Sequence, residues 1–262
     1  MSKECFYFKV WGSRGSIPTP GETTVYYGGN TSCVEVRCGD HLLILDAGTG
    51  LRSLGQSLLS ELPRTIHLLL SHLHWDHIQG FPFFTPIFLN TESQLIIYGE
   101  RKGKQSFKTT FAKQMKAPFF PVEFHYLPIK MSFKEIPAFH RFFIEDIQID
   151  TFSTWHPNDC LAFRITYKGK SLTYVTDAEL KNGHIDPNLI HGAKDTDYLF
   201  CDSMFTDEEY KKNYKDMFYD EFGFDGFIQY IDSVMNAKAD YFVTLNKNLM
   251  KRRNQLESKF KL

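Results

Sequence analysis

The chain has 262 residues, of which 42% are hydrophobic and 23% are charged, and its formal net charge at pH 7 is −1. This composition is typical of a folded globular protein, and the near-zero charge excludes a bulk electrostatic attraction to nucleic acid or to anionic membranes. No apolar run approaches the roughly 20 residues that span a bilayer. Residues 1–10 lack the basic start and apolar stretch of a signal peptide, so we expect a cytoplasmic protein with no membrane partner.

The first half of the chain alternates short apolar runs with glycine-rich turns, which predicts strands at residues 6–11, 32–36, 42–45 and 65–70. The last of these is typical of a buried strand. Gly39-Asp40 is a hairpin signal between the second and third strands. Helical spacing predicts a helix over residues 51–62 that ends at Pro63.

The second half repeats the theme, with strands predicted at residues 147–152, 161–167, 172–175, 198–200 and 240–245. A helix is predicted at residues 222–237 and a basic amphipathic helix at 247–262. Residues 99–138 combine lysines, prolines and aromatic residues, and we interpret them as an insertion or lid with one helix near residues 107–115. No internal repeat is present, so we expect one domain over residues 1–262.

The five cysteines agree with a reducing compartment. They are scattered, odd in number and form no CxxC pair, which argues against a disulfide framework or a cysteine zinc site. We expect buried thiols at all five positions, which are Cys5, Cys33, Cys38, Cys160 and Cys201.

Metal-ligating residue types are concentrated directly after the run at residues 65–70. The segment reads Ser71-His72-Leu73-His74-Trp75-Asp76-His77. Ligand groups collect at the carboxyl ends of strands in α/β architectures, and imidazoles with carboxylates suit zinc, iron and similar metals. The alternative, a histidine-rich surface turn, is disfavoured because the preceding strand is so apolar.

Three other strands are also followed by a residue of ligand type. His156 follows the strand at 147–152, Asp177 ends the strand at 172–175, and Asp46 follows the strand at 42–45. Each alone is more often a structural polar residue, so the repeated pattern carries the prediction. Asp46 suits a turn equally well; we favour a role in holding the second nitrogen of a ligand imidazole.

These residues in this order resemble the metallo-β-lactamase superfamily, and the resemblance covers almost the whole chain. Longer stretches are similar to a branch of phosphodiesterase-like and cyclic-nucleotide-phosphodiesterase-like hydrolases. They are residues 12–18, 27–33, 75–82 and 114–121. The resemblance implies an α/β fold, a four-layer αββα sandwich with the metals at one edge between two sheets.

The resemblance also implies a role for each candidate ligand. His72, His74 and His156 would bind a first metal ion, Asp76 and His77 a second, and Asp177 would bridge the two. The cofactor would be one or two divalent ions, with zinc preferred over manganese or iron. A metal-bound water would attack the substrate, and Asp76 and Asp177 would accept its proton.

The chain departs from this branch near its C-terminus, where two further histidines are usual. Phe224 stands where the first is expected, and Asn246 or Lys247 where the second is expected, and no histidine follows His191. This predicts one tight and one weak metal ion, with weak protonation of a leaving group. His184 is a candidate substitute ligand.

The preferred substrate is a small-molecule or nucleotide phosphodiester. Arg14 and Ser16 are candidate substrate contacts, because residues 12–21 form a glycine-rich, serine-rich loop whose amides suit an anion. Asn30, in the stretch at residues 27–33 that carries the resemblance, is a third candidate. A plain connecting loop is an equal alternative. Nucleic acid as a partner stays open, as does a homodimer. Two other functions remain: a degenerate, non-catalytic relative that binds a metal, a nucleotide or a protein, and a metal-dependent oxidoreductase.

Overall fold

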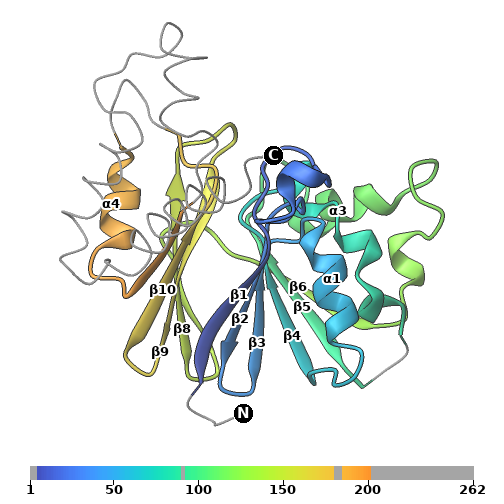
Figure 1. Cartoon of the computed structure of the whole chain (residues 1–262), viewed down its shortest axis with the longest axis horizontal. Coiled ribbons are helices and arrows are strands. Elements are labelled where there is room, and N and C mark those ends of the chain that lie inside the picture. The colour runs from blue at the N-terminus through green and yellow to red at the C-terminus, as the bar shows by residue number, and fades with distance from the viewer. Residues whose placement is uncertain (1–4, 90–91, 180–184, 202–262) are drawn as a thin grey trace, which may run out of the picture.

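Two β-sheets pack face to face in the computed structural model, which describes residues 5–89, 92–179 and 185–201, and helices cover their outer faces (Figure 1). The first sheet has the order β1-β2-β3-β4-β5-β6 and the second the order β11-β10-β9-β8-β7. Strands β3 to β6 are parallel, whereas β1, β2 and β3 pair antiparallel. The second sheet is antiparallel except for the pair of β10 and β11.

The bounds of the strands are as follows: β1 Phe6–Gly12, β2 Cys33–Cys38, β3 His41–Leu45, β4 Thr65–Leu69, β5 Gln94–Gly99, β6 Lys130–Glu135, β7 Arg141–Ile144, β8 Ile147–Thr154, β9 Cys160–Tyr167, β10 Lys170–Val175 and β11 Tyr198–Cys201. The α-helices are α1 Gly50–Ser57, α2 Trp75–Ile78, α3 Phe107–Ala112 and α4 Pro187–Ala193. Short 3-10 helices are η1 Glu22–Thr24, η2 Phe81–Phe83, η3 Thr85–Phe88, η4 Lys113–Met115 and η5 Phe124–Tyr126.

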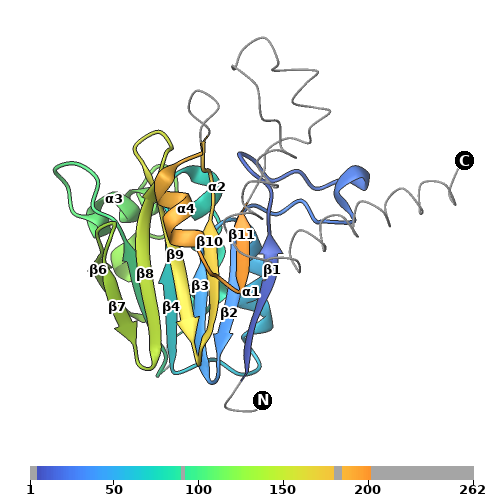
Figure 2. The ribbon, with the colours of Figure 1, turned by 90° about the vertical axis from the view of Figure 1, so that its left-hand side faces the viewer.

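Three apolar layers hold these elements together. One lies between the sheets and includes Val36, Leu45 and Phe163. A second packs α1 and α3 on the first sheet, and a third packs α4 on the outer face of the second sheet. Successive residues of a strand face opposite sides, so strands with apolar layers on both sides are apolar throughout. The predicted four-layer αββα sandwich is confirmed, and Figure 2 shows it from the side of α4 and the second sheet.

Most predicted elements are confirmed with ends shifted by one or two residues, including the Gly39-Asp40 hairpin between β2 and β3. The predicted end of the first helix is wrong, because α1 stops at Ser57 rather than near Leu62. Leu58 and Leu62 still contact the core, whereas Leu59 between them is 41% exposed. The Ser57 hydroxyl also bonds the Leu54 carbonyl, which competes with the helical ladder.

The segment at residues 99–138 contains more regular structure than we predicted. The helix expected near residues 107–115 is present as α3 followed by η4, and its residues Phe107, Phe111 and Met115 are buried in the core. The segment also supplies β6, which was not predicted and which pairs in parallel with β5. Neither β5 nor β7 was predicted. The elements expected at residues 222–237, 240–245 and 247–262 lie outside the described residues.

The loop after β3 is pressed against the end of α2 without room for a side chain. Ala47 N donates to His77 O at 2.8 Å, and Gly80 N donates to Ala47 O at 2.9 Å. A Cβ added to Gly80 would lie 1.9 Å from the carbonyl oxygen of Gly48. The contact fixes the path of the chain directly after Asp46 and after His77. Among the described helices, none is long and apolar enough to cross a membrane.

We predict that Gly80→Ala destabilises the protein, because the new methyl group must displace backbone rather than a flexible side chain. The expected loss of unfolding free energy is about 1–3 kcal/mol or more, measured by chemical denaturation. Gly15→Ala is the matched control, since a Cβ there meets nothing within 4 Å. Equal stability of the two variants would contradict the tight contact.

Candidate metal centre

Four strands deliver polar residues to one edge between the two sheets. Asp46 follows β3, and the segment from His72 to His77 follows β4. His156 and Asp177 follow β8 and β10 of the second sheet. Because β3 and β4 are parallel, their carboxyl ends meet at the same edge. The structure therefore brings together the ligand-type residues that the strand-end pattern singled out.

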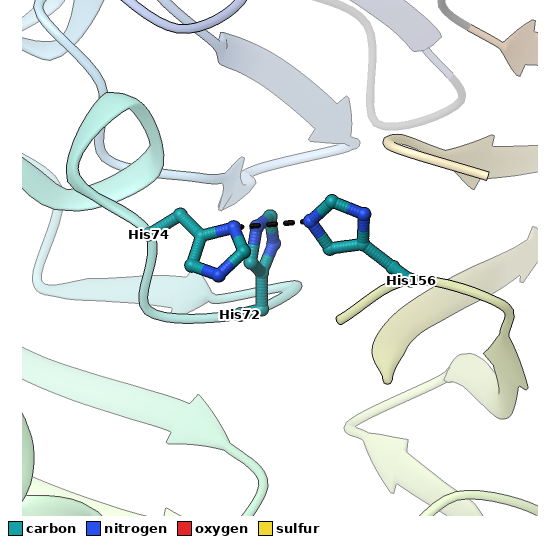
Figure 3. A group of neighbouring side chains, drawn as sticks. All are labelled: His72, His74 and His156. Carbon is teal, nitrogen blue, oxygen red and sulfur yellow. Dashed lines mark hydrogen bonds between the residues drawn. The ribbon is translucent and has the colours of Figure 1, made fainter. Parts of the chain in front are cut away.

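Three histidines form the first group of candidate ligands. One nitrogen each from His72, His74 and His156 lies within 4.8 Å of the others. Figure 3 shows the three rings turned toward one another, with His156 approaching from the opposite sheet. His156 Nε2 lies 3.0 Å from His74 Nδ1. Two nitrogens of different sheets thus converge on one point, which is the arrangement that a shared cation requires.

A second group shares His72 with the first and adds His77 and Asp177. Asp177 Oδ2 lies 2.8 Å from His77 Nε2 and 3.3 Å from His72 Nε2. The Asp76 carboxylate lies beside this group, with its Oδ2 3.4 Å from His77 Nε2. All six predicted ligands therefore gather at one centre.

The buried imidazole nitrogens of this centre fit a cation. His72 Nε2 and His77 Nε2 are buried and make no hydrogen bond within the described part of the chain. His77 Nε2 lies 2.8 Å from Asp177 Oδ2, a contact between the imidazole and a carboxylate at the same centre. A buried polar atom without a partner is costly. A divalent metal ion would satisfy both nitrogens, since neutral imidazole and carboxylate are common zinc ligands.

The tautomer of His72 follows from its neighbours. The hydroxyl group of Ser71 donates its one proton to Asp46 Oδ2 at 2.8 Å. Ser71 Oγ must therefore accept from His72 Nδ1, which lies 3.1 Å away. This leaves His72 Nε2 as a bare lone pair that faces the centre. His156 is oriented in the same way, because its Nδ1 lies 3.1 Å from Glu179 Oε1, an oxygen that accepts.

Burial and neighbouring charges set the pKa values of the candidate ligands. Burial, assisted by the charge of His77, lowers the pKa of His72 from 6.5 to about 3. Burial acts in the same direction on His77, but Asp46, Asp177 and Asp76 together raise the pKa of His77 to about 12. Burial raises the pKa of Asp76, yet contacts with His77 and the Ser16 amide lower that pKa overall. His72 is thus neutral at pH 7, as a ligand must be.

The Asp46 carboxylate orients His77 and the loop that begins at Ser71. It is fully buried, and its Oδ2 accepts from His77 Nδ1 at 2.8 Å. The backbone amide of Ser71 donates to its Oδ1, also at 2.8 Å. These contacts match the orienting role that we favoured for Asp46. Both Asp46 and Asp177 adopt a left-handed backbone, with φ of 61° and 53°, which turns each carboxylate out of its strand direction.

Sequence reasoning missed four residues that support the centre. They are Ser71, Cys160, Tyr174 and Glu179. Cys160 Sγ lies 3.6 Å from His72 Nδ1, and the Tyr174 hydroxyl donates to Asp46 at 2.8 Å. Ser71 lies inside the motif itself, and Tyr174 and Glu179 lie within three residues of Asp177. That proximity is the sequence signal for these three residues, whereas Cys160 carries no such signal.

The glycine-rich loop at residues 12–21 reaches the metal centre through its backbone. The Ser16 amide donates to Asp76 Oδ2 at 2.7 Å. Arg14 is exposed and pairs with Thr31 in an isolated bridge. The Asn30 side chain accepts from Thr49 Oγ1, and its carbonyl accepts from the amides of Ser13 and Arg14. Contact of Arg14, Ser16 or Asn30 with a substrate stays a prediction. Phe224, Asn246, Lys247 and His184 lie outside the described residues.

Comparison with known proteins gives one family match and several structural matches. A family model described as the beta-lactamase superfamily domain matches residues 41–237. Human tRNase Z, short form, is 16% identical and aligns over 89% of each chain with a TM-score of 0.61. Zn(2+)-bound PqqB from Methylobacterium extorquens is 14% identical over 78% of this chain and 75% of its own, with a TM-score of 0.55. A diphosphatase from the PhnP family is 15% identical over 74% and 72%, with a TM-score of 0.52.

These identities show a common fold and nothing more specific. A search of curated protein sequences finds no match to the chain.

We predict that replacing His72 and His74 together by alanine removes most of the tightly bound metal, because the group of three histidines keeps only His156. The measurement is elemental analysis of protein purified without chelator. The matched control replaces the exposed histidines His125 and His140 by alanine, which should leave the metal content unchanged. Native metal content in the His72→Ala, His74→Ala protein would refute the ligand assignment.

Proposed function

The chain belongs to the beta-lactamase superfamily, and from this premise we propose that it is a metal-dependent hydrolase that acts on phosphodiester bonds. The observation that carries the proposal is the pair of buried nitrogens, His72 Nε2 and His77 Nε2, which face the Asp177 carboxylate and make no hydrogen bond within the described part of the chain. A purely structural histidine cluster would have these atoms hydrogen-bonded.

The metal would be held by the residues that converge at the centre. His72, His74 and His156 would hold one ion, and His77, Asp76 and Asp177 a second, with zinc preferred and manganese or iron as alternatives. A bound divalent ion supplies Lewis acidity and lowers the pKa of water into the neutral range. The three nearby carboxylates offset the ion's charge in a buried place.

Two carboxylates are the proposed proton acceptors, and their surroundings differ. Asp76 is tied by the Ser16 amide and by His77, and only 12% of its side chain is exposed. Asp177 has 23% of its side chain exposed and is the better placed of the two to receive a proton from water. Asp76 would chiefly keep the site negative and position the loop that carries Ser16.

The substrate class rests on the anion-binding features beside the metal. Arg14 is exposed on the loop whose Ser16 amide touches Asp76, so its guanidinium would pair with a phosphate oxygen near the centre. Two proteins of the same fold carry the names of a ribonuclease and a diphosphatase, which supports a phosphate substrate. A cytoplasmic location and a homodimer remain predictions.

We predict that the native chain hydrolyses an activated aryl phosphodiester, and that this activity is lost with a chelator and restored by zinc or manganese. Arg14→Ala should raise the KM for the phosphodiester by roughly 10-fold to 100-fold, since a charged hydrogen bond is worth about 1.5–3 kcal/mol. The KM for an uncharged aryl ester should not change. Steady-state kinetics on both substrates give the comparison.

Arg101→Ala is the matched control, because Arg101 is an exposed arginine that pairs with Glu135 and Lys104 instead. Hydrolysis of the uncharged ester alone would move the substrate class away from phosphate. No hydrolysis of either substrate with metal fully bound would favour the non-catalytic binding protein.

A further inference from the structure

Tyr174 joins the two sheets directly behind the metal centre. It lies on β10, its side chain is 1% exposed, and its ring packs on Phe200 with centroids 5.3 Å apart. Its hydroxyl group crosses the inter-sheet layer and donates to Asp46 Oδ2 at 2.8 Å. Asp46 follows β3 of the other sheet, 128 positions away in the chain. The hydrogen bond therefore fixes one sheet relative to the other at the edge where the ligands lie.

The same carboxylate oxygen also holds His77. Asp46 Oδ2 accepts from His77 Nδ1 at 2.8 Å and from Ser71 Oγ at 2.8 Å. The Tyr174 hydroxyl is the donor that arrives from the second sheet. On that strand the chain reaches Asp177 only three residues later. Tyr174 is thus linked to His77 through Asp46 and to Asp177 through the backbone.

Both groups of candidate ligands depend on the spacing of the sheets, but not equally. His156 enters the first group on a loop that Glu179 and Asp186 also anchor, since Asp186 accepts from the Trp155 amide at 2.7 Å. The second group combines His77 and Asp177, the two residues that Tyr174 connects. Loss of the hydroxyl should therefore disturb the second group far more than the first.

We propose that Tyr174 is a positioning residue, which sets the geometry of the His77 and Asp177 metal position through its hydrogen bond to Asp46. The inference rests on the metal centre of the proposed function, but not on the substrate. Residues behind metal ligands typically change metal affinity by about 10-fold to 100-fold when altered. Tyr174→Phe keeps the ring and removes only the hydroxyl group.

The test is a zinc titration of the metal-free protein against a chromophoric chelator, with the native chain and two variants. Tyr174→Phe should weaken the weaker zinc position by about 10-fold to 100-fold and change the tighter position by less than about threefold. Tyr98→Phe is the control, because it removes a buried hydroxyl that lies 3.0 Å from His67 Nδ1, away from the ligands. It should leave both zinc affinities at native values while lowering unfolding stability by a similar amount.

Four outcomes overturn the inference. Native affinities in Tyr174→Phe would remove Tyr174 from the metal centre. Equal weakening of both positions, or the same weakening in Tyr98→Phe, would reduce the hydroxyl to a general packing role. A native chain that binds no zinc would overturn the proposed function as well, which distinguishes the two failures. Circular dichroism confirms that each variant is folded before the titration.

Discussion

The fully buried carboxylate of Asp46 is the constraint on which the rest of the centre depends. It accepts from the Ser71 amide and hydroxyl, from His77 Nδ1 and from the Tyr174 hydroxyl. A buried charge is tolerated only when donors surround it. Its donors come from the loop after β4 and from β10, so satisfying one carboxylate sets the relative positions of both sheets. The metal ligands on either side are placed by the same requirement.

Local backbone strain accompanies this arrangement. Asp46 and Asp177 both have positive φ, a conformation that costs of order 1–3 kcal/mol and persists only where the surroundings enforce it. The backbone conformation of Asp46 is enforced by the hydrogen bond from its amide to Leu69 O and by the contact between Gly48 and Gly80. An extended residue at either position would keep its side chain along the pleat of the strand. The strain is therefore what aims the two carboxylates at the edge between the sheets.

The sequence predicted the fold class through its resemblance to a known superfamily, and local patterns predicted which residues of ligand type would meet at one edge. Strand ends followed by histidine or aspartate are visible in the chain, and four of them meet at one edge. Strand β6 escaped prediction because it is an edge strand with lysines at both ends of its exposed face. The burial of Phe107 and Phe111 within a lysine-rich segment depends on β6 being there.

The residues that contact the ligands could not be predicted for a different reason. Whether Tyr174 meets Asp46 depends on the spacing of two sheets, which no local pattern encodes.

The shared histidine decides how the two groups of ligands can be occupied. His72 belongs to both groups, but its Nδ1 is used by Ser71 Oγ and contacts Cys160, so only the Nε2 lone pair faces the centre. One lone pair binds one metal ion. If His72 serves the ion held by His74 and His156, the second position keeps His77, Asp76 and Asp177, a set with one imidazole and two carboxylates. The ligands of the second position would carry negative charge and include hard carboxylate oxygens, whereas the ligands of the first would be neutral imidazoles. The two positions would thus differ in both affinity and metal preference, and the difference originates in the hydrogen bond that fixes the tautomer of a single side chain.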